Sequence, residues 1–234
     1  MLFYILTTYA NTGMFFTVFY NPIYFQFTRG DSSLMAAVRL LPYLLITMTL
    51  NLATGWALPR AKYYILLCLV SGILMTLAGA LLVAYLNSST PTSQIYGFSI
   101  VMAVGTGITM QLGYAVASLK VPASDIFSEI NLLNIAQIGT TVICLVIASQ
   151  VFQWTAIQNL NGVLAGRGFT QAEIHHAVAG TQSTLFETLA GDLRVTAIRA
   201  ITSAMQGSFI IPLVAGAVGL VSSLLTRSER LFDD

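Results

Sequence analysis

The fold of this chain is decided by stretches such as residues 63–86, which read YYILLCLVSGILMTLAGALLVAYL. No charged side chain interrupts this stretch. The hydrocarbon layer of a bilayer is about 30 Å thick, and about 20 helical residues cross it. Residues 63–86 are therefore predicted to form a helix that spans a membrane.

Five further stretches have the same character, namely residues 1–27, 34–57, 95–119, 126–151 and 205–226. Backbone amides cannot stay unpaired in lipid, so only helices and closed barrels cross a bilayer. Barrel strands would alternate in segments of about ten residues, and the sequence shows no such alternation. We therefore expect an all-α polytopic membrane protein with six transmembrane helices.

The composition excludes several classes of function. Hydrophobic residues make up 56% of the chain and charged residues 8%, against about 25% charged residues in soluble domains. A net charge of +1, with no basic stripe, argues against nucleic acid as a partner. The sequence lacks the metalloprotease pattern, paired intramembrane aspartates and a serine with a recognisable base, so we expect neither an enzyme nor a cofactor.

Cysteines and histidines do not predict a metal site. Cys68 and Cys144 each lie inside an apolar span, so we expect them to be packing residues. His175 and His176 lie near Glu173 but lack the spacing that gathers several ligands on one helical face. We expect these histidines to be solvated.

The charges between the spans predict how the chain crosses the membrane. Residues 1–153 are predicted to hold five helices, and residues 154–204 to form an extracytoplasmic loop. This loop is expected to contain short amphipathic helices, one that starts at Thr170 and another that lies on the outer surface. Residues 205–226 are predicted to form the sixth helix and residues 227–234 a cytoplasmic tail.

The basic residues in the connections predict the orientation of the chain. Short connections on one side hold Arg60, Lys62, Lys120, Arg227 and Arg230, whereas those on the other side hold only Arg29. Basic residues favour the cytoplasm, so both termini are expected there, with the glycosylation triplet at Asn87 outside.

The spans differ in polarity. Residues 63–86 and 205–226 carry few polar side chains and are expected to face lipid. Carboxamides in hydrocarbon need partners or water, so the first, fourth and fifth spans are predicted to face one another or a wet cavity. The candidates for this cavity wall are Tyr20, Asn21, Tyr24, Gln26, Gln111, Tyr114, Asn134 and Gln137.

Several residues in the spans have two interpretations. Arg39 and Glu129 each lie about one turn inside a span and near opposite faces, so we do not expect them to pair. They either anchor helix ends by reaching the interface or take part in transport. The glycines at 105, 107 and 113 either let helices pack closely or soften the fourth span at a gate.

The stretch YNPIYFQ at residues 20–26, followed by AVRLLP at residues 37–42, resembles the major facilitator superfamily, most closely its fungal fourteen-helix drug/proton antiporters. The resemblance continues in order through GTG at 105–107, Gln111-Leu112, Pro122, Gln137 and SQVF at 149–152. Three positions depart from the family pattern: Asn21 stands for leucine, Gly113 for proline and Lys62 for glycine.

This resemblance extends to the last six helices of that family. It implies one half of a major facilitator fold, the carboxy-terminal half, made of two inverted three-helix units. In that scheme the first and fourth spans line the central cavity, and the second and fifth help form the interface with the other half. The third and sixth spans lie outside.

The resemblance also implies a function. A protein of this branch exports a hydrophobic or amphipathic drug or toxin by proton antiport, in the plasma or vacuolar membrane. Its small-molecule site lies between two halves, so an amino-terminal half is the expected partner, and we expect no export by this chain alone. The alternative is a non-transporting truncated protein, or a scaffold that pairs with another half.

The orientation can be tested with single cysteines in a background without Cys68 and Cys144. One cysteine replaces Ser89, in the connection between the third and fourth spans, and the other follows Asp234. A membrane-impermeant maleimide is expected to label the first in intact cells and the second only after permeabilisation, because basic connections stay cytoplasmic. Labelling of both from one side would contradict the predicted orientation.

Overall fold

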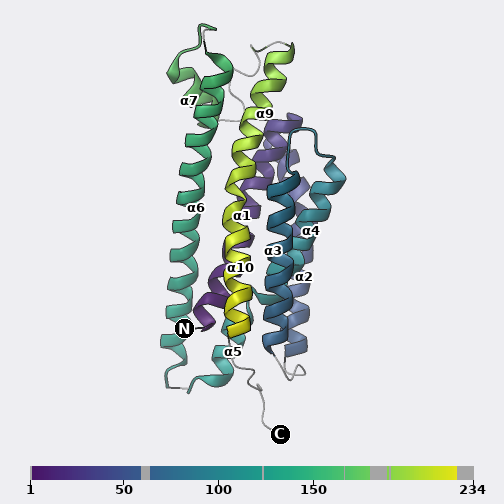
Figure 1. Ribbon diagram of the computed structural model, residues 1–234. Coiled ribbons are helices and arrows are strands. Elements are labelled where there is room, and N and C mark those ends of the chain that lie inside the picture. The colour runs from purple at the N-terminus through teal and green to yellow at the C-terminus, as the bar shows by residue number, and fades with distance from the viewer. Residues whose placement is uncertain are drawn as a thin grey trace.

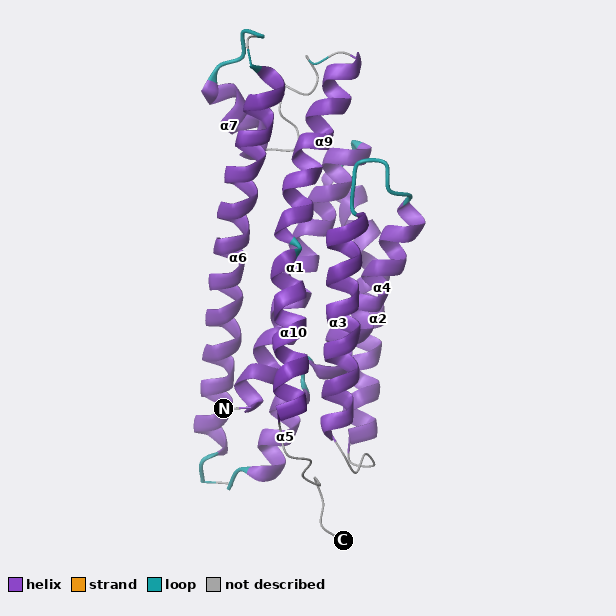
Figure 2. Cartoon of the chain, in the orientation of Figure 1, coloured by secondary structure: helices purple, strands orange, loops and turns teal. Residues whose placement is uncertain are grey.

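A computed structural model describes residues 2–58, 64–122, 124–165, 167–179, 189 and 191–225. Within these residues the chain is helical and contains no strand, which confirms the all-α prediction (Figure 2). The helices are α1 (Leu2–Arg29), α2 (Ser33–Ala57), α3 (Tyr64–Tyr85), α4 (Thr92–Thr109), α5 (Leu112–Lys120), α6 (Ile126–Leu164), α7 (Gln171–Ala179), α9 (Gly191–Ser208) and α10 (Ile210–Leu225).

The long helices run up and down along a common direction (Figure 1). The start of α1 and the end of α10 lie at one end of the bundle, whereas the connection from α3 to α4 and helix α7 lie at the other. Asn87, in the connection from α3 to α4, is therefore separated by the length of the bundle from the start of α1 and from the end of α10, as the predicted topology requires. Which end faces the cytoplasm stays a prediction, because the basic residues 60, 62, 227 and 230 lie outside the described residues.

Five helical segments are long and apolar enough to cross a membrane: Ser33–Ala57, Tyr64–Tyr85, Thr92–Ser118, Ile126–Leu164 and Gly191–Leu225. They make the protein an integral, multi-pass membrane protein. Helix α1 has 28 residues but is not among the five, and its sequence is rich in threonine, tyrosine and asparagine. The sixth span therefore stays a prediction. Helix α1 nevertheless lies inside the bundle, in contact with α2, α4, α5, α6, α9 and α10.

The fourth predicted span is not one straight helix. Helix α4 ends at Thr109 and α5 begins at Leu112, with Met110 and Gln111 in the turn between them. The sequence predicts two roles for the glycines of this region, namely close helix packing and softening of the span at a gate. A Cβ atom on Gly105 would lie 2.7 Å from Met75 Cγ, and one on Gly107 would lie 2.8 Å from the Thr47 carbonyl oxygen. These two glycines permit close packing on α3 and α2, and the break in the helix follows directly after them.

Helices at the far end extend beyond their predicted limits. Helix α6 continues past Val151 to Leu164, because Ala156, Leu160 and Leu164 form a buried stripe on its extension. Helix α7 begins after Thr170, as the sequence predicts. The Thr170 amide donates to Glu173 Oε2 at 2.7 Å, and the Glu173 amide donates to Thr170 Oγ1 at 3.3 Å, which together form a capping box. The hydrogen bonds from Thr170 lower the pKa of Glu173.

Helix α9 does not lie along the outer surface, where the sequence predicts an amphipathic helix. It rises in line with α10 and packs against α6 (Figure 1). Its apolar residues Ala197, Ile201 and Met205 are fully buried, and Asn159 Nδ2 of α6 donates to the Ala200 carbonyl at 3.0 Å. The apolar face is therefore covered by protein.

The predicted outermost spans are not the most exposed ones. Helices α3 and α10 each bury one face against the other, while residues such as Leu66 and Val214 are exposed on their outer faces. The least buried spans are α6 and α2. These are the two spans that the family resemblance assigns to an interface with another half.

Glycines bring α3 and α10 into backbone contact. A Cβ atom on Gly216 would lie 2.7 Å from the Thr76 amide nitrogen, and one on Gly79 would lie 2.7 Å from Leu213 Cα. In lipid there is no hydrophobic drive between helices, so small residues that permit close approach stabilise their association. This seam holds the last helix to the bundle.

The substitution Gly216→Ala tests the seam. Its methyl group would press on the α3 backbone, so we expect the free energy of unfolding to fall by about 1–3 kcal/mol. The matched control is Gly97→Ala on α4, where nothing lies within 4 Å of the added Cβ; it should raise stability by about 0.5–1 kcal/mol, because glycine is a poor helix residue. Reversible unfolding in mixed micelles measures both, and equal effects would argue against the close contact.

Candidate functional site

A set of uncharged polar side chains joins α1, α5 and α6. Gln137 Nε2 donates to Asn11 Oδ1 at 2.7 Å, and Asn11 Nδ2 donates to the Thr7 carbonyl at 2.7 Å. The Tyr114 hydroxyl lies 2.8 Å from Asn134 Oδ1 and also contacts Gln137 Oε1. We call Asn11, Tyr114, Asn134 and Gln137 the carboxamide cluster.

Local geometry explains how these residues meet. Asn134 and Gln137 are three residues apart and so lie on one face of α6. The turn at Met110 and Gln111 starts a new helix, α5, which contacts both α1 and α6 and carries Tyr114 to them. Of the predicted candidates, the structure therefore brings Tyr114, Asn134 and Gln137 together.

The cluster is only partly covered by this chain. Asn11 is fully buried and Gln137 half-buried, whereas Asn134 and its neighbour Asn131 are exposed on α6. Exposed carboxamides on a membrane-spanning helix are costly in hydrocarbon, so such residues face water or a polar partner. One side of the cluster is thus buried against α1, and the other, at Asn131 and Asn134, is exposed. We call the exposed side the open side.

A cavity lies between α1 and α6, towards α7. Its volume is about 470 Å³, and its lining includes Tyr20 and Gln26 of α1, Phe152 and Gln153 of α6 and Val178 of α7. The Tyr20 ring stacks on Phe16 with centroids 4.2 Å apart and meets Phe152 edge-on at 6.0 Å. The cavity therefore offers aromatic surface together with two carboxamides.

The other predicted candidates lie elsewhere. Asn21 Nδ2 donates to Ser99 Oγ of α4 at 2.9 Å, and the Tyr24 hydroxyl donates to the Asn87 carbonyl at 2.7 Å. Both residues are buried and join α1 to α4 and to the connection before it. Gln111 lies in a small cavity of about 50 Å³ that Asn51 and Thr54 of α2 also line. The eight candidates thus occupy several places.

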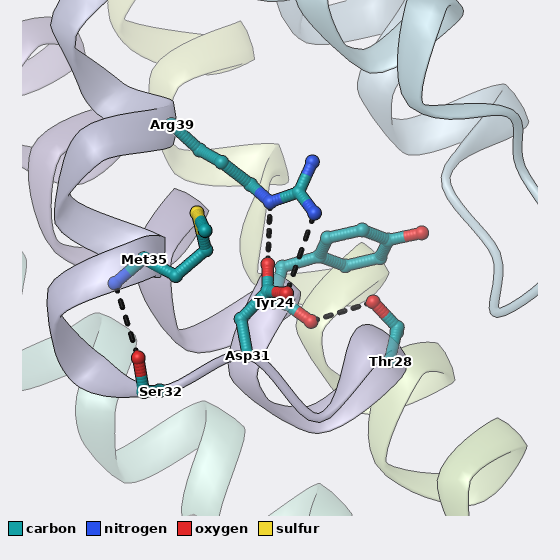
Figure 3. Close-up of polar contacts among 6 residues, drawn as sticks. All are labelled: Tyr24, Thr28, Asp31, Ser32, Met35 and Arg39. Atoms are coloured by element: carbon teal, nitrogen blue, oxygen red, sulfur yellow. Dashed lines mark hydrogen bonds and ion pairs between the residues drawn. The ribbon is translucent and has the colours of Figure 1, made fainter.

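Arg39 and Glu129 lie apart and each has its own partner. Arg39 Nε lies 2.5 Å from Asp31 Oδ2 and its guanidinium lies 5.0 Å from the centre of the Phe25 ring. Figure 3 shows the guanidinium turned towards Asp31, which follows Gly30 in the turn between α1 and α2. Gly30 has φ 66°, a backbone conformation that favours glycine. At the other end of α1, the Tyr4 hydroxyl donates to Glu129 Oε2 at 3.2 Å.

Some residues of these sites were not among the predicted candidates. Asn11 completes the carboxamide cluster, and Gln153 and Ser149 line the larger cavity. A polar residue within an apolar span was the available signal for Asn11. Gln153 lies beyond the predicted end of the fifth span, so no such signal marked it.

The chemistry of these sites is hydrogen bonding and aromatic contact. Within the described part of the chain, no group of three or more histidine, cysteine, aspartate or glutamate residues is placed to hold a metal ion. His175 and His176 are exposed on α7. The carboxamides and tyrosine rings are suited to orient an uncharged or flat molecule.

Comparison with known proteins reveals similar chains in fungi. An efflux pump of Aspergillus clavatus, patC, is 36% identical over 227 residues, which are 97% of this chain and 41% of the pump. An MFS-type transporter of Penicillium expansum is 36% identical over 98% of this chain and 42% of its own length. A phomenoic acid biosynthesis cluster MFS-type transporter of Leptosphaeria maculans is 34% identical over 99% of this chain and 39% of its own. No family model and no solved structure matches the chain. The chain thus spans about two fifths of the length of these relatives.

A double-mutant cycle on Asn11→Ala and Gln137→Ala tests the carboxamide cluster. We expect a coupling free energy of about 0.5–1.5 kcal/mol, because double-mutant cycles on hydrogen bonds between membrane helices average about 0.6 kcal/mol and reach about 1.7 kcal/mol. The control cycle pairs Asn11→Ala with Gln153→Ala. Gln153 lines the larger cavity and its Nε2 donates to Ser149 Oγ, so its coupling to Asn11 should be near zero. Unfolding in mixed micelles gives both values, and equal coupling in the two cycles would refute the direct bond.

Proposed function

Because this chain belongs to the same family as the fungal MFS-type transporters and efflux pumps, we propose that it forms one wall of a small-molecule export pathway. Its fold is that of a multi-pass helical membrane protein. The proposal assigns it to the carboxy-terminal half of such a transporter, as the motifs at residues 20–26 and 37–42 suggest. The wall is formed by the carboxamide cluster and by the cavity at Tyr20.

The open side of the carboxamide cluster carries the proposal. A helix that faced lipid all round would not keep Asn131 and Asn134 exposed. A water-filled pathway closed by a second wall removes this cost, because carboxamides are then hydrated or bound to substrate. The poor burial of α2 and α6 within the chain supports the same arrangement.

The lining favours an uncharged or amphipathic substrate. Tyr20 and Phe152 supply aromatic faces, and Gln26 and Gln153 supply donors and acceptors to orient a polar group. Glu129 is the only acidic residue within the six predicted spans. We therefore assign most of the proton coupling to the partner half.

Drug accumulation in cells without their own pumps tests the function. The chain is expressed alone, and together with the part of the Aspergillus clavatus pump that lies outside the aligned region. Accumulation of rhodamine 6G is expected to fall only when both parts are present, because one wall cannot enclose a pathway. Export by the 234-residue chain alone, or no export by a pair that assembles, would overturn the proposal; the second result would favour a scaffold.

Variants on α5 and α6 test the site in the assembled pair. Asn134→Leu and Tyr114→Phe remove hydrogen bonds worth about 1 kcal/mol each, so we expect efflux of some substrates in a panel to change by about fivefold. The matched control is Ile135→Leu, next to Asn134 and 68% exposed, which should leave the profile unchanged. Unchanged profiles in all three variants, at equal expression, would remove the carboxamide cluster from the pathway.

A further inference from the structure

A second kind of cavity opens on the flank of the bundle, between α6 and α10. Its volume is about 330 Å³ and its floor is the face of α1 from Ile5 to Thr12. Thr140 and Cys144 of α6 form one wall, and Ile210 to Val218 of α10 form the other. We call it the flank groove. Its two walls belong to segments that are apolar enough to cross a membrane, and it lies on the opposite side of α10 from the α3 seam.

We propose that the flank groove binds one acyl chain of a bilayer phospholipid. The α10 wall is aliphatic: Ile210, Val214 and Val218 line the groove and are about half exposed. The medium around a helix at this depth is hydrocarbon, so the groove cannot be filled by water without cost. An acyl chain is the matching occupant, because it packs on the aliphatic side chains of α10 and needs no hydrogen bond.

The polar atoms on the floor do not require a polar ligand. The Thr8 hydroxyl donates to the Ile5 carbonyl at 3.0 Å, and the Thr12 hydroxyl lies 2.8 Å from the Thr8 carbonyl and 3.8 Å from Cys144 Sγ. The Tyr9 hydroxyl bonds to Ser71 Oγ at 3.2 Å, below the floor. A hydrocarbon chain therefore leaves none of these three hydroxyls without a partner.

The residues of α10 that line the groove recur along one face of this helix. The wall from Ile210 to Val218 is about 12 Å long at 1.5 Å per residue. A groove that runs along the helix axis accommodates a linear chain.

Photolabelling tests the proposal without any assay of transport. The chain is reconstituted in phosphatidylcholine vesicles with a trace of phosphatidylcholine that carries a diazirine in mid-chain, and labelled peptides are mapped by mass spectrometry. We expect residues lining the groove, such as Thr140 and Val218, to be labelled several-fold more than Ile143 and Val221, which are exposed on the same helices outside it. Uniform labelling of all exposed faces would overturn the proposal, since it would indicate bulk lipid only.

Substitutions that fill the groove provide the second arm. Ala215→Phe and Thr140→Phe place a ring in the groove from opposite walls and are expected to reduce labelling at Val218 several-fold. The matched variant Val221→Phe adds the same ring to α10 outside the groove and should leave labelling unchanged. Undiminished labelling in both filled variants would refute the acyl-chain site.

Discussion

The rest of this structure depends on one constraint: in hydrocarbon, every backbone amide and polar side chain needs a partner. The backbone meets it by forming helices throughout the described spans. Many threonine and serine side chains meet it by bonding to a carbonyl one turn back in their own helix. Other polar side chains bond between helices, and many of these bonds involve α1. This helix bonds to α6 through Asn11 and Tyr4, to α4 through Asn21 and to α3 through Tyr9. The most polar of the predicted spans is for this reason the most central.

Close packing stabilises the association of these helices, because the hydrophobic effect gives no drive between helices in lipid. Gly72, Gly79 and Gly216 let α3 and α10 approach to backbone contact, and Gly105 and Gly107 do the same for α4 against α3 and α2. Helix α6 has no comparable seam and remains the least buried span. It is attached to the bundle through α1, through α9 and by the carboxamide cluster.

This uneven packing links the fold to the proposed function. The tightly packed helices α3, α4 and α10 form a stable side, whereas α2 and α6 leave apolar and polar groups exposed. The exposed carboxamides of α6 indicate where a second wall belongs, and the flank groove between α6 and α10 marks a surface that faces lipid. One helix, α6, therefore borders both the proposed pathway and the bilayer.

The sequence by itself determined the helical class and most of the spans, because the length of an apolar run is a local property that lipid thickness makes decisive. It also placed the start of α7, since a capping box involves only neighbouring residues. Tertiary structure alone decided which polar residues meet. Of the four candidates between residues 20 and 26, Tyr20 and Gln26 line a cavity with α6, while Asn21 and Tyr24 bond to α4 and to its preceding connection. Each residue of a helix is turned by about 100° from the last, so adjacent side chains serve different neighbours, and only the packing of distant segments identifies those neighbours.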